Sequence, residues 1–390
     1  MTVAFKTFGC RLNRAEALDL EAALAAAGHV VVPIPTEAAG DLPAPDWIVV
    51  RGCSVTARAQ HDCEKEIARL AARFPGARIW RTGCLPGAEK SPSAPDSEAV
   101  PMSTSRAYLK VQDGCGGRCA FCIVPQFRGP PASAPFDLVL ERARAFIAAG
   151  YRELVVTGCN LAMYRDSGRS LPQLLAALAA ISPSPGAPPA HRVRLGSIEP
   201  GICDDALLDV IAAHQNICRF LHISVQSADD SVLRGMRRPY SAAVVARLCE
   251  RARKLVGPRL ALGADVIAGF PGETDSAFRT TVEFLERTPF THLHVFPFSK
   301  RPGTPAATMP AQVPRAVRLE RAHALDRLAK SLRASFAQSF VGGEVEVCVE
   351  KGGLRGFTSE YLPCRLTAPR PRRSLVKTTV RQSDDGVLLG

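Results

Sequence analysis

Three cysteines lie within one short segment, which reads Gln112-Asp-Gly-Cys115-Gly-Gly-Arg-Cys119-Ala-Phe-Cys122. Thiolates are soft ligands that suit iron–sulfur clusters. A four-iron cluster held by three thiolates keeps one iron without a ligand from this loop, and an open coordination position is where a metal centre binds a reactive molecule. The glycines allow the loop to fold tightly around such a cluster. The spacing therefore predicts a reactive iron–sulfur site, against the alternatives of a zinc loop or a chance grouping.

A second set of cysteines is dispersed along the first 84 residues. Cys10, Cys53 and Cys84 each follow a glycine, and each lies at the carboxyl end of an expected strand. In one parallel sheet such strand ends meet at one edge, so the three thiols are candidates for a second site. The alternative stays open, because free cysteine is also a common buried residue. Cys63 lies on an expected helix and reads as a core residue or a bystander.

The elements that would position the dispersed cysteines follow a strand–helix–strand pattern, which predicts parallel βαβ units. We expect strands over residues 2–7, 29–34, 46–50 and 77–81, and helices over 14–27 and 56–73. Residues 85–105 are rich in Pro and Ser and predict a linker.

The same alternation resumes in residues 106–335, where six strands and the helices between them predict a partial parallel barrel. Function in such folds lies at the carboxyl ends of the strands. Strands are expected over 108–112, 153–157, 192–196, 221–225, 261–267 and 292–297, and helices near 135–149, 170–181, 204–214, 240–255 and 274–287. The fold class is thus α/β.

The C-terminal part changes character. Residues 311–339 predict one long helix, and residues 300–340 carry eight Lys or Arg against only Glu320 and Asp326, which favours a phosphate-contacting surface over a merely solvated face. Short alternating strands over 344–350, 355–362 and 374–380 predict a small β domain at 340–390. Its last residues, 382–390, read as polar and weakly patterned.

The composition agrees with this organisation. The 390 residues are 46% hydrophobic, which excludes a disordered chain or a small disulfide scaffold. The net charge of +12 favours an anionic partner such as nucleic acid, although a compositional preference for Arg gives the same balance. Neither a targeting segment nor a long apolar run is visible, so we expect a cytoplasmic protein whose thirteen cysteines are mostly reduced.

The Cys-x3-Cys-x-Phe-Cys segment after the first strand of a six-fold βα array resembles the radical S-adenosylmethionine (SAM) enzymes. The resemblance implies that Cys115, Cys119 and Cys122 hold a [4Fe-4S] cluster whose open iron chelates SAM and cleaves it to a 5′-deoxyadenosyl radical. It also implies a set of SAM-binding residues, namely Phe121, Thr157, Gly158, Ser197, Glu199, Ile267 and Gly269.

The motifs Gly9-Cys10-Arg-Leu-Asn13, Cys53-Ser-Val-Thr56 and Thr82-Gly-Cys84 resemble those of the methylthiotransferases within that group. This resemblance covers nearly the whole chain. It implies that Cys10, Cys53 and Cys84 hold an auxiliary [4Fe-4S] cluster that carries the sulfur to be inserted. It also implies that the C-terminal β domain is an RNA-binding TRAM module. The chain departs from the family at Arg51-Gly52, where Asn-Thr is usual, and at 130–135.

The Arg-Leu pair after Cys10 is most similar to the branch that acts on N6-threonylcarbamoyladenosine at position 37 of tRNA. The implied reaction uses two SAM molecules and inserts a methylthio group at C2 of that base in the anticodon loop. We expect a monomer that takes electrons from a flavodoxin or ferredoxin and does not bind membranes. The alternatives are a methylthiotransferase acting on isopentenyladenosine-37 or on a ribosomal-protein aspartate, and a non-enzymatic iron–sulfur RNA-binding protein.

Overall fold

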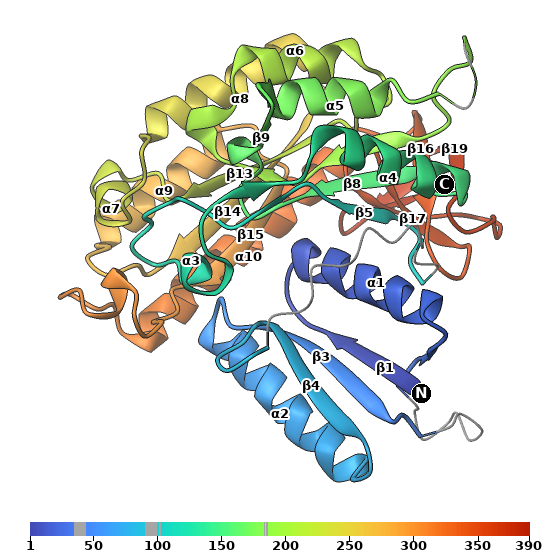
Figure 1. Ribbon diagram of the computed structural model, residues 1–390. Coiled ribbons are helices and arrows are strands. Elements are labelled where there is room, and N and C mark those ends of the chain that lie inside the picture. The colour runs from blue at the N-terminus through green and yellow to red at the C-terminus, as the bar shows by residue number, and fades with distance from the viewer. Residues whose placement is uncertain (35–43, 90–99, 101–102, 183, 185) are drawn as a thin grey trace.

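The computed structural model describes residues 1–34, 44–89, 100, 103–182, 184 and 186–390 (Figure 1). It confirms the expected α/β class, with an N-terminal parallel sheet, a partial barrel and a C-terminal β region. Most of the segment interpreted as a linker, residues 85–105, lies outside the described residues. Within the described residues, no helix is long and apolar enough to cross a membrane.

The N-terminal sheet has the strand order β2-β1-β3-β4, and its three strand pairs are parallel. Its elements are β1 (Thr2–Thr7), α1 (Arg11–Ala26), β2 (Val30–Val32), β3 (Trp47–Cys53), α2 (Ala57–Arg73) and β4 (Arg78–Cys84). Helix α1 lies between this sheet and the barrel, while α2 covers the other face (Figure 1). Helix α1 begins three residues before the predicted start, so its first turn follows Cys10 directly.

The barrel strands are β5 (Ala107–Lys110), β8 (Glu153–Thr157), β11 (Arg192–Leu195), β13 (Phe220–Gln226), β14 (Ala261–Ala268) and β15 (His292–Pro297), and every pairing among them is parallel. The helices around them are α4 (Phe136–Ala148), α5 (Leu171–Ala179), α6 (Asp205–Ala213), α8 (Ala242–Val256) and α9 (Asp275–Arg287). Short elements fill the loops: β6 (Gln112–Asp113), α3 (Val124–Arg128), β7 (Ala132–Ser133), β9 (Arg165–Asp166), β10 (Arg169–Ser170), β12 (Ser197–Ile198) and α7 (Asp230–Gly235), with 3-10 turns at Leu161–Met163, Pro200–Ile202 and Pro305–Ala307.

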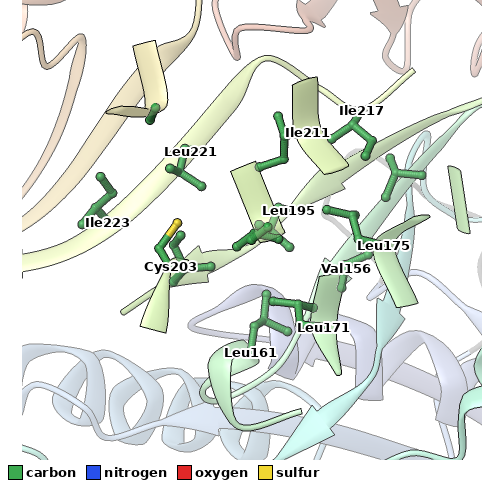
Figure 2. Packing of buried hydrophobic residues seen from close by; sticks show 14 of the residues in the cluster. Val156, Leu161, Leu171, Leu175, Leu195, Cys203, Ile211, Ile217, Leu221 and Ile223 are labelled. Atoms are coloured by element: carbon green, nitrogen blue, oxygen red, sulfur yellow. The ribbon is translucent and has the colours of Figure 1, made fainter. Parts of the chain in front are cut away.

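One large apolar cluster holds the barrel strands against their helices. Val156 and Leu195 on neighbouring strands pack against Leu175 of α5, with Leu221 and Ile223 of β13 close by (Figure 2). Each of these side chains is buried, and full burial of one such side chain stabilises the fold by roughly 1.5–3 kcal/mol. The core therefore lies between strands and helices, which leaves the opposite face of each strand, toward the barrel interior, free for polar residues.

The C-terminal part consists of α10 (Arg315–Gln338), which packs on β15, and a six-stranded sheet of order β19-β16-β17-β18-β21-β20. The strands are β16 (Glu344–Val349), β17 (Arg355–Thr358), β18 (Pro363–Arg365), β19 (Leu375–Thr379), β20 (Gln382–Asp384) and β21 (Val387–Leu389). The description of 382–390 as weakly patterned was wrong, because these residues form the β20–β21 hairpin. Asp385 and Gly386 both have positive φ, which suits a tight hairpin turn.

The C-terminal sheet docks on the amino-terminal end of the barrel. Arg194 of β11 donates to the carbonyl oxygens of Thr358 (2.8 Å) and Ser359 (3.0 Å), and Arg192 donates to that of Phe357 (2.7 Å). Both guanidinium groups also bind the buried carboxylate of Glu153 on β8. Burial alone would raise the pKa of Glu153, but the two arginines hold it well below its usual range. This arrangement closes the end of the barrel away from the cysteine loop.

Candidate functional site

The loop after β5 brings Cys115, Cys119 and Cys122 together. The backbone N–H of Gly117 donates to Cys115 Sγ at 3.3 Å, and a Cβ on Gly117 would lie 3.2 Å from Cys115 Sγ and 3.7 Å from Cys119 Sγ. The N–H of Cys122 donates to the carbonyl of Cys119 at 3.2 Å, which turns the loop back on itself. The glycine thus leaves room for a compact group between the sulfurs.

Two side chains from other barrel loops complete this site. Arg238 Nη1 donates to Cys119 Sγ at 2.9 Å, and its Nη2 pairs with Glu199 Oε1 at 2.6 Å. Asn160 donates to Glu199 Oε2 at 3.0 Å and lies 4.0 Å from Cys115 Sγ. Sequence reasoning gave no role to Arg238 or Asn160. Arg238 lies in the short segment between α7 and α8.

The second set of cysteines also converges. Cys53 and Cys84 are register partners at the ends of β3 and β4. A Cβ on Gly9, next to Cys10, would lie 3.0 Å from Cys53 Sγ, and Gly9 has φ of +90°. Asn13 fixes this geometry because its amide donates to the carbonyls of Phe8 (3.0 Å) and Gly52 (2.7 Å). The spacing of Asn13 after Cys10 was the available signal for this anchoring role.

Both thiol sets fit a soft metal centre. Burial raises the pKa of the Cys122 thiol to about 11, and the neighbouring Cys119 and Cys115 add to the rise. Burial also raises the pKa of Cys53 to about 11, with Cys10 among the contributing neighbours. As free thiols these groups would stay protonated at neutral pH, whereas a bound cation supplies the charge that stabilises thiolates. The three-sulfur donor sets suit iron–sulfur clusters at both places.

Two consecutive residues connect the sites. Arg128 Nε donates to Cys84 Sγ at 3.1 Å, and the carbonyl of Gly129 accepts from the N–H of Cys115 at 3.1 Å. Arg128 belongs to α3, directly after the barrel cysteine loop, and so ties the N-terminal thiols to that loop. Sequence reasoning did not assign this role to Arg128.

Glu16 of α1 is the anion at the centre of this connection. It accepts from Arg128 (2.9 Å) and Lys110 (2.5 Å) and also pairs with Arg51. Burial would raise the pKa of Glu16, but the hydrogen bond and charge of Arg128, helped by Lys110 and Arg51, lower it far below its usual range. Arg128 also contacts Asp113 Oδ1 at 3.1 Å, two residues before Cys115. Charged groups from α1, α3, β3, β5 and β6 therefore hold the two sites in register.

The departure at Arg51-Gly52 has a local explanation. Arg51 is buried and takes part in the ion pair with Glu16. A Cβ on Gly52 would lie 2.1 Å from the Leu85 side chain, so glycine lets Leu85 close over the strand. Cys63 is fully buried on α2 with its Sγ 3.4 Å from the N–H of Cys53, which agrees with a packing residue.

The predicted SAM-binding residues line the strand ends around the barrel cysteines. Phe121 packs edge-on to Phe270 at 6.5 Å and joins an apolar cluster that contains Ile267. Gly269 follows β14 with φ of +76°, and Ser197 lies on β12. These residues therefore share one region, although their contacts with SAM stay predictions.

The remaining predicted contacts lie beside the loop. Thr157 ends β8, and a Cβ on Gly158 would lie 2.9 Å from Gln112 Cβ, so Gly158 permits close approach of two strand ends. Glu199 is held by Arg238, as described above. Cys159 donates to Asp113 Oδ1 at 3.4 Å, which agrees with a lining residue rather than a ligand.

The basic stretch at 300–340 is less free than its charge suggests. Arg321 is buried against Glu273 (2.7 Å), and Arg318 packs on Gly269. Arg301 is buried too, with its guanidinium on Gln60. The exposed cations of the stretch are Lys300, Arg315, Arg327 and Lys330. Any phosphate-contacting surface here would rest on these four.

His222 of β13 and His294 of β15 lie close together on the two sides of β14, with their ring centroids 4.7 Å apart. His222 Nε2 lies 2.9 Å from Asp265 Oδ1, and His294 Nδ1 lies 3.4 Å from the same oxygen. Burial would raise the pKa of Asp265, but His222 and His294 lower it below its usual range. His222 is buried, whereas His294 is exposed.

Comparison with known proteins gives a consistent result. Residues 109–285 match the model of the radical SAM superfamily, and residues 2–101 match that of the uncharacterized protein family UPF0004. The threonylcarbamoyladenosine tRNA methylthiotransferase MtaB of Thermotoga maritima is 32% identical over 93% of this chain and 90% of its own. The tRNA-2-methylthio-N(6)-dimethylallyladenosine synthase of Novosphingobium aromaticivorans is 31% identical over 90% of this chain and 87% of its own.

Among solved structures, the radical S-adenosylmethionine methyltransferase TsrM from Kitasatospora setae aligns with a TM-score of 0.58. The two proteins are 15% identical, and the alignment covers 78% of this chain and 77% of that one, so it shows the fold. The two methylthiotransferase relatives align with this chain along nearly their whole length, and this establishes the family. The chain belongs to the radical SAM methylthiotransferase family.

Proposed function

We propose that this protein is a tRNA methylthiotransferase that inserts a methylthio group at C2 of N6-threonylcarbamoyladenosine at position 37. The observation that carries the proposal is the pair of three-cysteine sites joined through Arg128 and Gly129. Methylthio transfer needs a sulfur-carrying site beside a radical-generating site, and this chain holds two such donor sets in fixed register. The name of the MtaB relative supports the substrate.

The two cysteine sets and the arginines beside them have separate roles in this proposal. Cys115, Cys119 and Cys122 would hold one [4Fe-4S] cluster, and Cys10, Cys53 and Cys84 the other. When bound, the clusters and SAM supply the sulfur, the methyl group and the radical. Arg238 and Arg128 donate hydrogen bonds to one sulfur in each set, which favours the more negative, reduced state of a cluster. The other residues around the two sites would orient the base and exclude water from the reaction site.

The RNA partner is proposed to be the anticodon loop, whose unstacked bases an enzyme can splay into a pocket. The division into residues 1–84, 106–335 and 340–390 stays a proposal, as does the TRAM-like role of the last part. We further propose a cytoplasmic monomer that is reduced by a flavodoxin or ferredoxin. The exposed cations of α10 would contact phosphates.

Mass spectrometry of tRNA nucleosides from a deletion strain tests the function. We expect loss of the 2-methylthio form of N6-threonylcarbamoyladenosine, restored by the wild-type gene but not by the Cys119→Ala variant. The 2-methylthio form of isopentenyladenosine should be unchanged. Loss of that second nucleoside instead would favour isopentenyladenosine-37 as the substrate. The name of the dimethylallyladenosine synthase relative is the reason to include this alternative. No change in either nucleoside would refute a tRNA substrate.

A further inference from the structure

A basic cavity of about 430 Å³ opens beside Cys10, outside the network that joins the two cysteine sites. Its wall includes the end of β1, the first turn of α1, the residues before β5 and two segments of the C-terminal sheet region. Five cations line it, Arg11, Arg14, Arg106, Lys351 and Arg372, against the single carboxylate of Glu350. The lining therefore carries a net charge of +4, from five positive groups and one negative group.

Part of this charge is not neutralised by the protein. Arg106 pairs with Glu350 at 2.9 Å. Within the described part of the chain, no carboxylate lies within 4.0 Å of the charged groups of Arg11, Arg14 or Lys351. Arg11 instead lies over the ring of Tyr361, 5.2 Å from its centroid. Guanidinium groups that no carboxylate contacts are suited to bind an anion, and their planar shape suits a carboxylate or phosphate in particular.

The place of the cavity narrows the choice of anion. C2 of adenine, which receives the methylthio group, and C6, which bears the N6 substituent, flank N1 on the same ring. A base whose C2 faces the Cys10 site therefore directs its N6 substituent beside that site, whereas its ribose and phosphates lie on the opposite edge. The cavity also exceeds the size of a phosphate and falls within the range of small-ligand pockets.

We propose that this cavity binds the carboxylate of the N6-threonylcarbamoyl group, with Arg11 and Arg14 as its principal partners. The hydroxyls of Ser103 and Thr104 in the same wall suit the hydroxyl and amide groups of that substituent. The proposal rests on the proposed function and deepens it. It makes Arg11 and Arg14 residues that determine which modified adenosine is accepted. An RNA backbone phosphate is the other source of the same ligand chemistry.

The test uses the anaerobically reconstituted full-length protein and three synthetic anticodon stem-loops. Position 37 carries threonylcarbamoyladenosine, its neutral methyl ester, or unmodified adenosine. We expect the wild type to bind the acid more tightly than the ester by a factor on the order of 10 to 100, the range for hydrogen bonds to charged groups. Arg11→Gln and Arg14→Gln should each reduce this preference and leave binding of the ester unchanged.

The controls separate the possible causes. Arg58→Gln, at a side chain 92% exposed on α2, should leave the preference intact. Iron content and cluster absorbance of Arg11→Gln should equal those of the wild type, because Arg11 follows a cysteine ligand. The two variants could instead weaken binding of all three stem-loops equally and reduce the salt dependence of that binding. The cavity would then bind an RNA phosphate, and the carboxylate proposal would be overturned. An unchanged preference in both variants overturns it as well.

Failure of the proposed function has a different signature. In that case the wild type itself would not methylthiolate the threonylcarbamoyl stem-loop in the presence of SAM and reductant. A wild type that reacts, together with variants that keep the acid-over-ester preference, refutes only the role of the cavity.

Discussion

Replacement of Arg128 by methionine should loosen the N-terminal sheet from the barrel. The guanidinium contacts Cys84 Sγ (3.1 Å), Glu16 Oε1 (2.9 Å) and Asn13 Oδ1 (2.7 Å), and its side chain is only 8% exposed. Removing one partner of a buried ion pair costs about 3–5 kcal/mol, because the other charge is left buried. Glu16 keeps Lys110 as a partner, so we expect a loss of about 2–3 kcal/mol in the free energy of unfolding.

Denaturant unfolding of the anaerobic, cluster-loaded protein, followed by circular dichroism, measures this loss. The decisive comparison is a double-mutant cycle with Glu16→Gln. If the two side chains interact as the structure shows, the double variant should be more stable than the sum of the single losses predicts, by roughly 1–3 kcal/mol. Additivity within about 0.5 kcal/mol would refute the reasoning.

A redox titration gives an independent readout. Loss of the Arg128 hydrogen bond to Cys84 removes a group that stabilises the reduced cluster, so the potential of the auxiliary cluster should become more negative. Arg238→Met is the matched control, because it removes the corresponding bond to Cys119 and should shift only the other cluster. A shift of the same cluster in both variants would show that these bonds do not act locally.

Three further predictions concern the same regions. Cys53→Ala should lower the iron content from about eight to about four per chain and keep SAM cleavage, whereas Cys119→Ala should abolish 5′-deoxyadenosine formation; both are measured by iron assay and chromatography. Gly158→Ala should weaken SAM binding about tenfold in equilibrium dialysis, because its Cβ would lie 2.9 Å from Gln112 Cβ and displace the strand end. Burial lowers the pKa of His292 to about 3, so the unfolded chain binds more protons than the folded protein below about pH 6.5, and the free energy of unfolding decreases as the pH falls. Between pH 7.5 and 5.5 the wild type should lose about 1 kcal/mol that His292→Phe keeps, as measured by denaturant titration.

Most of the scaffold could be predicted from sequence because strongly patterned segments decide it. The predicted barrel strands 153–157 and 292–297 coincide with β8 and β15. For β8 the reason is burial along its whole length, because a short buried apolar run leaves little choice of boundary. The convergence of Cys10, Cys53 and Cys84 followed from the rule that parallel strand ends meet at one edge. Local pattern and topology were sufficient there.

The contacts that connect the two sites could not be predicted in the same way. Glu16 and Arg128 are 112 positions apart, and each reads in its own segment as an ordinary surface charge. The same limit affected the basic stretch, where Arg301 and Arg321 are buried against distant partners. A count of Lys and Arg residues takes no account of burial. It therefore overestimated how many cations in this stretch are exposed. The last hairpin, by contrast, could have been predicted, because the pair Asp385-Gly386 is typical of a two-residue hairpin turn.

The polar character of the junction between the N-terminal sheet and the barrel follows from what it must do. Directed contacts cross this junction, among them the ion pairs Glu16–Arg128 and Asp19–Arg142, which join α1 to α3 and α4. An apolar contact tolerates sliding, whereas hydrogen-bonded ion pairs are lost when the partners move by about 1 Å, since such bonds span only about 2.7–2.9 Å. Two sites that must act on one base need that precision. The buried charges thus fix relative position at a cost in desolvation that a core of the same size would avoid.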